Sequence, residues 1–129
     1  MAERRRTWGF RLSPVDALVL AATPPLTWAA WDAFTPMGGV IPFAVGHFFL
    51  FCNVFRIHRR KELLWAAVAL VLWPLCASAP QMAWWWPFAA QTPLTIALIA
   101  WEMRGPGYHG ILARRLNPRL DEYLQGATP

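Results

Sequence analysis

Charged side chains are scarce in this sequence of 129 residues, where they make up 15%. An ordinary soluble domain carries roughly 25%. Acidic residues are fewest, with seven Asp and Glu in total, while hydrophobic residues make up 57%. A single domain of this length cannot cover so much apolar surface with so few charges, so we expect lipid or a partner to cover it.

Cysteine is also nearly absent. Cys52 and Cys76 are the only two, and they stand alone, so they form neither a metal-ligand spacing nor a disulfide framework. If the two segments that carry them run antiparallel across a bilayer, the thiols lie near opposite ends and beyond the reach of a disulfide. We expect two buried apolar cysteines and no metal site.

Recognisable catalytic signatures are missing as well. The sequence has no Ser-His-Asp motif, no glycine-rich phosphate loop and no secretory signal peptide, because no small-residue cleavage site follows the basic start. Catalytic groups converge in space rather than in sequence, so an enzyme is not excluded. A non-enzymatic role is the preferred hypothesis, and the sequence identifies no cofactor.

Positive charge is present, with a net charge of +5, and it is strongly segregated. The twelve cations form three blocks: Arg4, Arg5, Arg6 and Arg11; Arg56, Arg59, Arg60 and Lys61; and Arg104, Arg114, Arg115 and Arg119. Long, nearly uncharged stretches separate the blocks, which leaves no continuous basic face, and we expect no nucleic-acid partner. Cytoplasmic loops and tails of membrane proteins hold Lys and Arg in this way.

Apolar runs between the blocks predict membrane spans. Residues 40–55 are almost entirely apolar and continue directly into the cations of 56–61, as expected for a helix that reaches the cytoplasmic surface. Four spans near the 20 residues that a bilayer requires are predicted, at about 15–34, 37–55, 63–79 and 87–103.

These spans predict an all-α membrane protein with four transmembrane helices in an up-down bundle. The transmembrane domain covers 15–104, between a basic interfacial segment, 1–14, and a tail, 105–129, with a short amphipathic helix. Because the cations occupy both tails and the middle loop, both termini are predicted to be cytoplasmic, in a bacterial-type inner membrane.

Short sequence motifs predict where the first two spans begin and where the first one bends. Ser13, Pro14 and Asp16 predict a helix start. Pro24-Pro25 should kink or open the first span, with Thr23 and Thr27 returning hydrogen bonds to freed backbone groups. Thr35-Pro36 is predicted to open the second span.

Polar residues inside the spans are functional candidates by default. They are His47, Asn53, Gln91, Thr95 and Glu102. His47 can ligate a haem or pigment or relay protons, or it can be a neutral imidazole bonded to a neighbouring helix. Asn53 and Gly46 together indicate a packed helix interface. Gln91, Thr95, Leu98 and Glu102 share one helix face by their 3.6-residue spacing, and this face is predicted to point into the bundle.

The basic loop is the most charge-dense site. Its candidates for binding an acidic headgroup, a phosphate or a thiolate cofactor are Arg56, His58, Arg59, Arg60 and Lys61. The alternative is a loop that only sets topology. Over the seven residues 56–62 the segment resembles the Arg-x-His-Arg stretch of the small four-span glutathione and eicosanoid membrane enzymes. Arg60 and Lys61 stand where that family has Asn and an acid, and Glu62 comes one place early, so no active-site role is carried over.

The tail carries a predicted short helix between Asn117-Pro118 and Gly126. One face of it holds Leu116, Leu120, Tyr123 and Leu124. This face can dock on the protein's own loop, on the membrane surface or on a partner. Asp32, the only charge on the predicted outer side, is expected to be solvated or to pair with a partner's cation.

The sequence therefore favours a small integral inner-membrane protein that is an accessory, scaffold or assembly subunit of a larger complex. Its expected partners are the lipid bilayer and either other membrane proteins or further copies of itself. Two alternatives stay open: a small membrane enzyme whose basic loop, 56–61, holds the anion of a lipid or amphipathic substrate, and a haem- or pigment-binding protein that uses His47.

Overall fold

The computed structural model describes residues 6–34, 37–79 and 83–126, and every element of regular secondary structure within them is helical, which confirms the all-α class. The long helices are α1 (Pro14–Phe34), α2 (Val40–Phe49), α3 (Arg59–Ala77) and α4 (Trp86–Met103). A 3₁₀ turn, Met37–Gly39, precedes α2, and a π-helical stretch, Leu50–Val54, continues it. Two short helices, α5 (Ala113–Leu116) and α6 (Leu120–Leu124), follow α4.

No helix in the described ranges combines the length and the hydropathy that crossing a bilayer requires. This finding overturns the predicted multi-pass inner-membrane location with both termini inside, and it leaves the transmembrane bundle without support. The second predicted span is broken, because α2 ends after ten residues and the backbone continues as a π-helix. The third starts earlier than predicted, so α3 contains the charged Arg-Arg-Lys-Glu sequence of 59–62. In α1 and α4, proline, threonine, tryptophan and carboxylate residues dilute the aliphatic ones.

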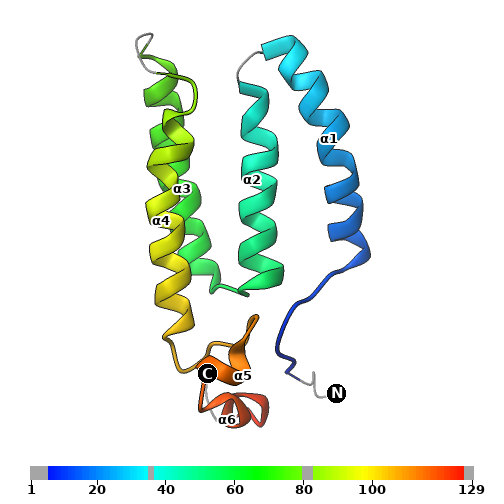
Figure 1. Ribbon diagram of the computed structural model, residues 1–129, viewed down its shortest axis with the longest axis vertical. Coiled ribbons are helices and arrows are strands. Elements are labelled where there is room, and N and C mark those ends of the chain that lie inside the picture. The colour runs from blue at the N-terminus through cyan, green and yellow to red at the C-terminus, as the bar shows by residue number, and fades with distance from the viewer. Residues whose placement is uncertain (1–5, 35–36, 80–82, 127–129) are drawn as a thin grey trace.

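The four long helices form two hairpins (Figure 1). α1 packs on α2, and α3 packs on α4. Both described ends of the chain and the connection between α2 and α3 lie at the same end of the molecule (Figure 1). The described members of the three cation blocks therefore belong to segments at this end. Arg4 and Arg5, like the predicted span opening at Thr35-Pro36, lie outside the described residues.

The start of α1 is capped as its sequence indicates. The backbone N–H of Asp16 donates to Ser13 Oγ at 3.2 Å, and the N–H of Ser13 donates to Asp16 Oδ2 at 2.7 Å, which satisfies two donors reciprocally. Further along, Thr23 and Thr27 donate to the carbonyls four residues before each of them, Val19 and Thr23. These are not the carbonyls freed by Pro24-Pro25, so that prediction is wrong: a threonine hydroxyl reaches the carbonyl of its own preceding turn.

Two apolar clusters hold the fold together. Phe51, Ile57, Trp65 and Leu98 form the first, between the hairpins. The second cluster is Tyr108, Ala113 and Leu120, beneath the end of the π-helical stretch. Backbone hydrogen bonds fasten this second cluster to the helices, since the N–H of Ile111 donates to the Val54 carbonyl at 2.8 Å.

Candidate functional site

Glu102, in the last turn of α4, is the centre of a buried ionic cluster. Its side chain is only 3% exposed. One carboxylate oxygen lies 2.6 Å from His58 Nδ1, and the other accepts a hydrogen bond from Lys61 Nζ at 2.7 Å. His58 is the residue that precedes α3 and Lys61 lies in the first turn of α3, so the cluster fastens the beginning of α3 to the end of α4.

The electrostatics of this cluster keep Glu102 ionised. Burial alone would raise the pKa of Glu102, but hydrogen bonds from Lys61 and His58, together with their charges, outweigh burial and hold the pKa below its ordinary value. The imidazole of His58 is oriented by this carboxylate through Nδ1, and the His58 side chain is 61% exposed. Its other nitrogen, Nε2, takes no part in this contact.

A separate hydrogen-bonded ladder joins α3 and α4 further along α4. Trp65 Nε1 donates to Thr95 Oγ1 at 2.9 Å, and Gln91 Nε2 donates to the Trp65 carbonyl at 3.0 Å. Gln91, Thr95, Leu98 and Glu102 all lie on the buried face of α4, where their spacing places them. Gln91 Oε1 is buried and has no hydrogen-bond partner among the described residues. The ladder fixes the ring of Trp65, which is the centre of the first core cluster.

The basic-loop candidates separate into two groups. Arg56, with a left-handed backbone (φ 49°), donates from its guanidinium to the Thr7 carbonyl at 2.6 Å, and His58 and Lys61 are engaged by Glu102. Arg59 and Arg60 are exposed, and within the described part of the chain they make no hydrogen bond or ion pair. Among the described cations of the basic loop, only Arg59 and Arg60 are available to an external anion without losing an internal contact.

His47 and Asn53 have internal contacts. His47 Nδ1 lies 2.8 Å from the Phe43 carbonyl, and its ring stacks on Trp65 with centroids 4.9 Å apart. Asn53 is buried; when its amide is oriented to satisfy its hydrogen bonds, it donates to the Arg11 carbonyl and to Asp16 Oδ2. Gly46 has open space where a Cβ would be, so the predicted close helix interface at Gly46 is wrong.

The predicted docking face of the tail packs on the protein itself. Leu120 is buried in the second cluster, and Tyr123 and Leu124 pack against that cluster. Leu116, the remaining residue of the predicted docking face, is exposed. The tail is locked further by Asn117, whose Nδ2 donates to the Pro106 and Tyr108 carbonyls, each at 2.8 Å.

A groove lies between α2 and α3 and reaches the beginning of α3. It consists of two adjoining cavities, of about 840 Å³ and about 640 Å³, that share Ala44, Trp65 and Ala66. Cys52, Arg59 and Glu62 line the second cavity. The Cys52 thiol donates to Glu62 Oε1 at 3.3 Å. Burial, and then the neighbouring Glu62, raise the pKa of Cys52 to about 12, so this thiol is protonated at neutral pH.

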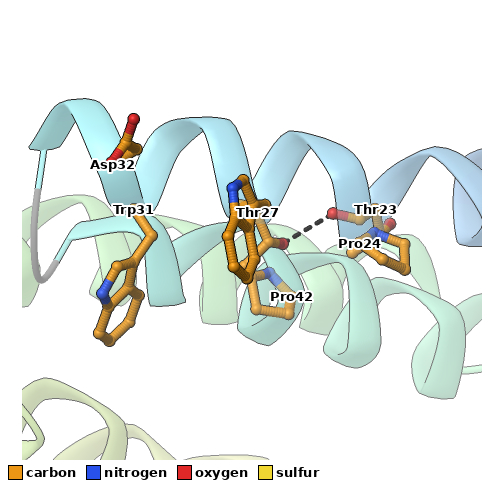
Figure 2. A pocket seen from close by; sticks show the side chains of 7 residues that line it. Thr23, Pro24, Thr27, Trp31, Asp32 and Pro42 are labelled. Atoms are coloured by element: carbon orange, nitrogen blue, oxygen red, sulfur yellow. Dashed lines mark hydrogen bonds between the residues drawn. The ribbon is translucent and has the colours of Figure 1, made fainter.

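A further pocket of about 620 Å³ lies where α1 faces the beginning of α2. Trp28, Trp31, Asp32 and Pro42 are among the residues that line it. Figure 2 shows that the carboxylate of Asp32 points away from the ring of Trp31.

The sequence analysis predicted neither the groove nor the contacts of Glu102 with His58 and Lys61. Both depend on which helices become neighbours, and the only signals were the alanines at 44, 66 and 69 and an acid at the end of α4. Among the residues that the structure describes, no group of three or more His, Cys, Asp or Glu is arranged to hold a metal ion.

The chain matches no protein-family model, and no characterised protein or solved structure resembles it significantly.

Proposed function

We propose that this protein is an accessory or scaffold subunit that binds an apolar helix of a partner protein along the outer face of α3. The observation that supports this proposal is a row of exposed aliphatic side chains: Leu64, Val68, Val71 and Leu75. Their 4-3-4 spacing is that of the core positions of a helix pair, which places all four on one side of α3. We call this row the α3 seam.

The total exposed surface supports a large interface. The chain exposes 9258 Å². A compact monomer of its mass, 14.7 kDa, is expected to expose about 6,900 Å². The excess is larger than the roughly 800 Å² that each partner contributes to a standard interface and reaches the range of obligate complexes. Obligate interfaces are also the more hydrophobic ones, which fits a seam made only of Leu and Val.

The α3 seam is separate from the rest of the site. Trp65 and Lys61 face α4, where they contact Thr95 and Glu102. Arg59, Ala66 and Leu70 line the groove. None of the four seam residues lines either cavity of the groove, so a partner helix on the seam leaves the groove accessible.

The test is native mass spectrometry of the full-length protein isolated from its source cells. We expect a stoichiometric complex with a second protein that Val71→Glu abolishes, because a carboxylate in the centre of an apolar helix interface would be buried without a partner. Leu70→Glu is the matched control: Leu70 is 77% exposed and Val71 is 70% exposed, but only Leu70 faces the groove. A monomer, a pure homo-oligomer, or equal loss of the complex in both variants would contradict the proposal.

A further inference from the structure

We propose that the groove between α2 and α3 binds a long-chain fatty carboxylate, with the hydrocarbon chain along the apolar wall and the carboxylate at Arg59. This ligand site is additional to partner binding through the α3 seam. It rests on the shape of the groove, on the distribution of charge along it and on its volume.

The groove is continuous because its two cavities share three lining residues, Ala44, Trp65 and Ala66. α1 packs on α2 and α3 packs on α4, so the hairpins meet mainly through aromatic side chains near Trp65. Alanine at 44 and 66 leaves room beside that contact. From Arg59 to Ser78 the groove follows nearly the whole of α3, about 28 Å at 1.5 Å per residue.

Polarity changes from one end of the groove to the other. Around the larger cavity the lining is apolar apart from the indoles of Trp65 and Trp73 and the hydroxyl of Ser78. The Trp65 indole already donates to Thr95, and the Ser78 hydroxyl donates to the Leu75 carbonyl. At the α3 start, Arg59 brings a guanidinium that has no partner among the described residues. A molecule that fits must therefore be hydrocarbon over most of its length and anionic at one end.

Glu62, which lines the groove beside Arg59, restricts which anions can bind at this end of the groove. Glu62 lines the same end as Arg59, and its Oε1 accepts the Cys52 thiol. One negative charge next to the single guanidinium disfavours a doubly charged phosphate head, since like charges at short range repel. A carboxylate carries one charge and matches the paired geometry of a guanidinium.

The volume of the groove favours a small molecule over a partner helix as its ligand. Each cavity lies within the range of about 300–1,000 Å³ that is typical of small-ligand sites. A partner helix is at least about 10 Å wide with its side chains, and over 28 Å it would need about 2,000 Å³ or more. The two cavities together fall short of that volume, but they exceed what a single extended hydrocarbon chain needs.

The experiment is a titration of the full-length protein with palmitate below its aggregation threshold, followed by calorimetry. We expect saturable binding at one site. Arg59→Gln should weaken it tenfold or more, the effect of losing one hydrogen bond to a charged group. Arg60→Gln, a neighbouring exposed cation outside the groove, should change affinity less than twofold. Hexadecanol, which has the same chain without the charge, should bind the unmodified protein and Arg59→Gln equally.

The position of the hydrocarbon chain has its own test. Leu70→Glu places a carboxylate in the apolar wall and should weaken palmitate binding tenfold or more, while Val71→Glu, on the seam, should leave it unchanged. Absence of saturable binding would overturn the proposal, as would equal effects of Arg59→Gln and Arg60→Gln, or of Leu70→Glu and Val71→Glu. Loss of the partner complex in Val71→Glu with palmitate binding intact would separate the two proposals.

Discussion

Replacing Glu102 by glutamine should destabilise the fold by about 2–4 kcal/mol. The carboxylate is 3% exposed and accepts two charge-assisted contacts, from His58 at 2.6 Å and from Lys61 at 2.7 Å. Each hydrogen bond to a charged group contributes about 1.5–3 kcal/mol. An amide keeps one acceptor oxygen but turns an N–H₂ donor toward the second donor, so one contact is lost and Lys61 is left poorly compensated.

The assay is urea unfolding at neutral pH, monitored by far-ultraviolet circular dichroism, with the free energy of unfolding taken by linear extrapolation. Glu122→Gln is the matched control, because Glu122 is exposed in the short helix α6. Changes at such surface positions are usually within about 0.5 kcal/mol. If the two glutamine variants have the same stability, the ionic cluster does not hold α3 on α4 and this account is refuted.

The pH dependence provides a second check with a definite sign. The folded-state pKa of Glu102 lies below its ordinary value of 4.5. A carboxyl group with a lowered pKa adds stability above its unfolded pKa, and this stability is lost as the pH falls through the folded pKa. The advantage of the unmodified protein over Glu102→Gln should therefore be complete near neutrality and shrink below about pH 4.5. A difference that grows on acidification would contradict the assignment of charge.

Four further variants test the packing of the chain. Gly110→Ala should lower the midpoint of thermal unfolding, because the added Cβ would lie 2.4 Å from the Phe55 carbonyl oxygen. Gly46→Ala, by contrast, adds a Cβ in open space on α2 and should stabilise the helix by up to about 1 kcal/mol. Asn117→Ala should cost about 2–3 kcal/mol in urea unfolding, since its amide nitrogen holds two carbonyls at 2.8 Å. Burial raises the pKa of Tyr108 from 10.0 to about 12, so its contribution is complete below pH 10 and is lost as the pH rises toward 12; Tyr108→Phe should reduce this alkaline loss of stability.

The buried face of α4 could be predicted from the sequence, but the partners of that face could not. Spacing alone places Gln91, Thr95 and Glu102 on one side of a helix, and the structure has them there. That Glu102 meets Lys61, 41 residues away in sequence, depends on the pairing of α3 with α4. The spacing of residues within one helix carries no information about which other helix it will pack on.

The membrane prediction failed for a related reason. Residues 37–55 look like one continuous apolar helix, but the register changes at Leu50, where α2 gives way to a π-helical stretch. This change places Asn53 against Asp16 and the start of α1. π-helical stretches are rare and have no dependable sequence signal, so a count of apolar residues overestimates the helix.

α3 has three faces, and the contacts that one face makes with α4 determine how the other two are presented to the groove and to a partner helix. Trp65 and Lys61 point to α4, Ala66 and Leu70 to the groove, and Val71 belongs to the outer seam. Because the contacts with α4 are polar and buried, they fix the rotation of α3 about its own axis, and this rotation decides which side chains reach the groove and which reach the seam. Lys61→Met, which removes one of those polar contacts, should therefore weaken palmitate binding and partner binding together, although Lys61 lines neither cavity of the groove and is not part of the seam. Loss of only one of the two activities in Lys61→Met would show that the cluster does not set the orientation of the helix.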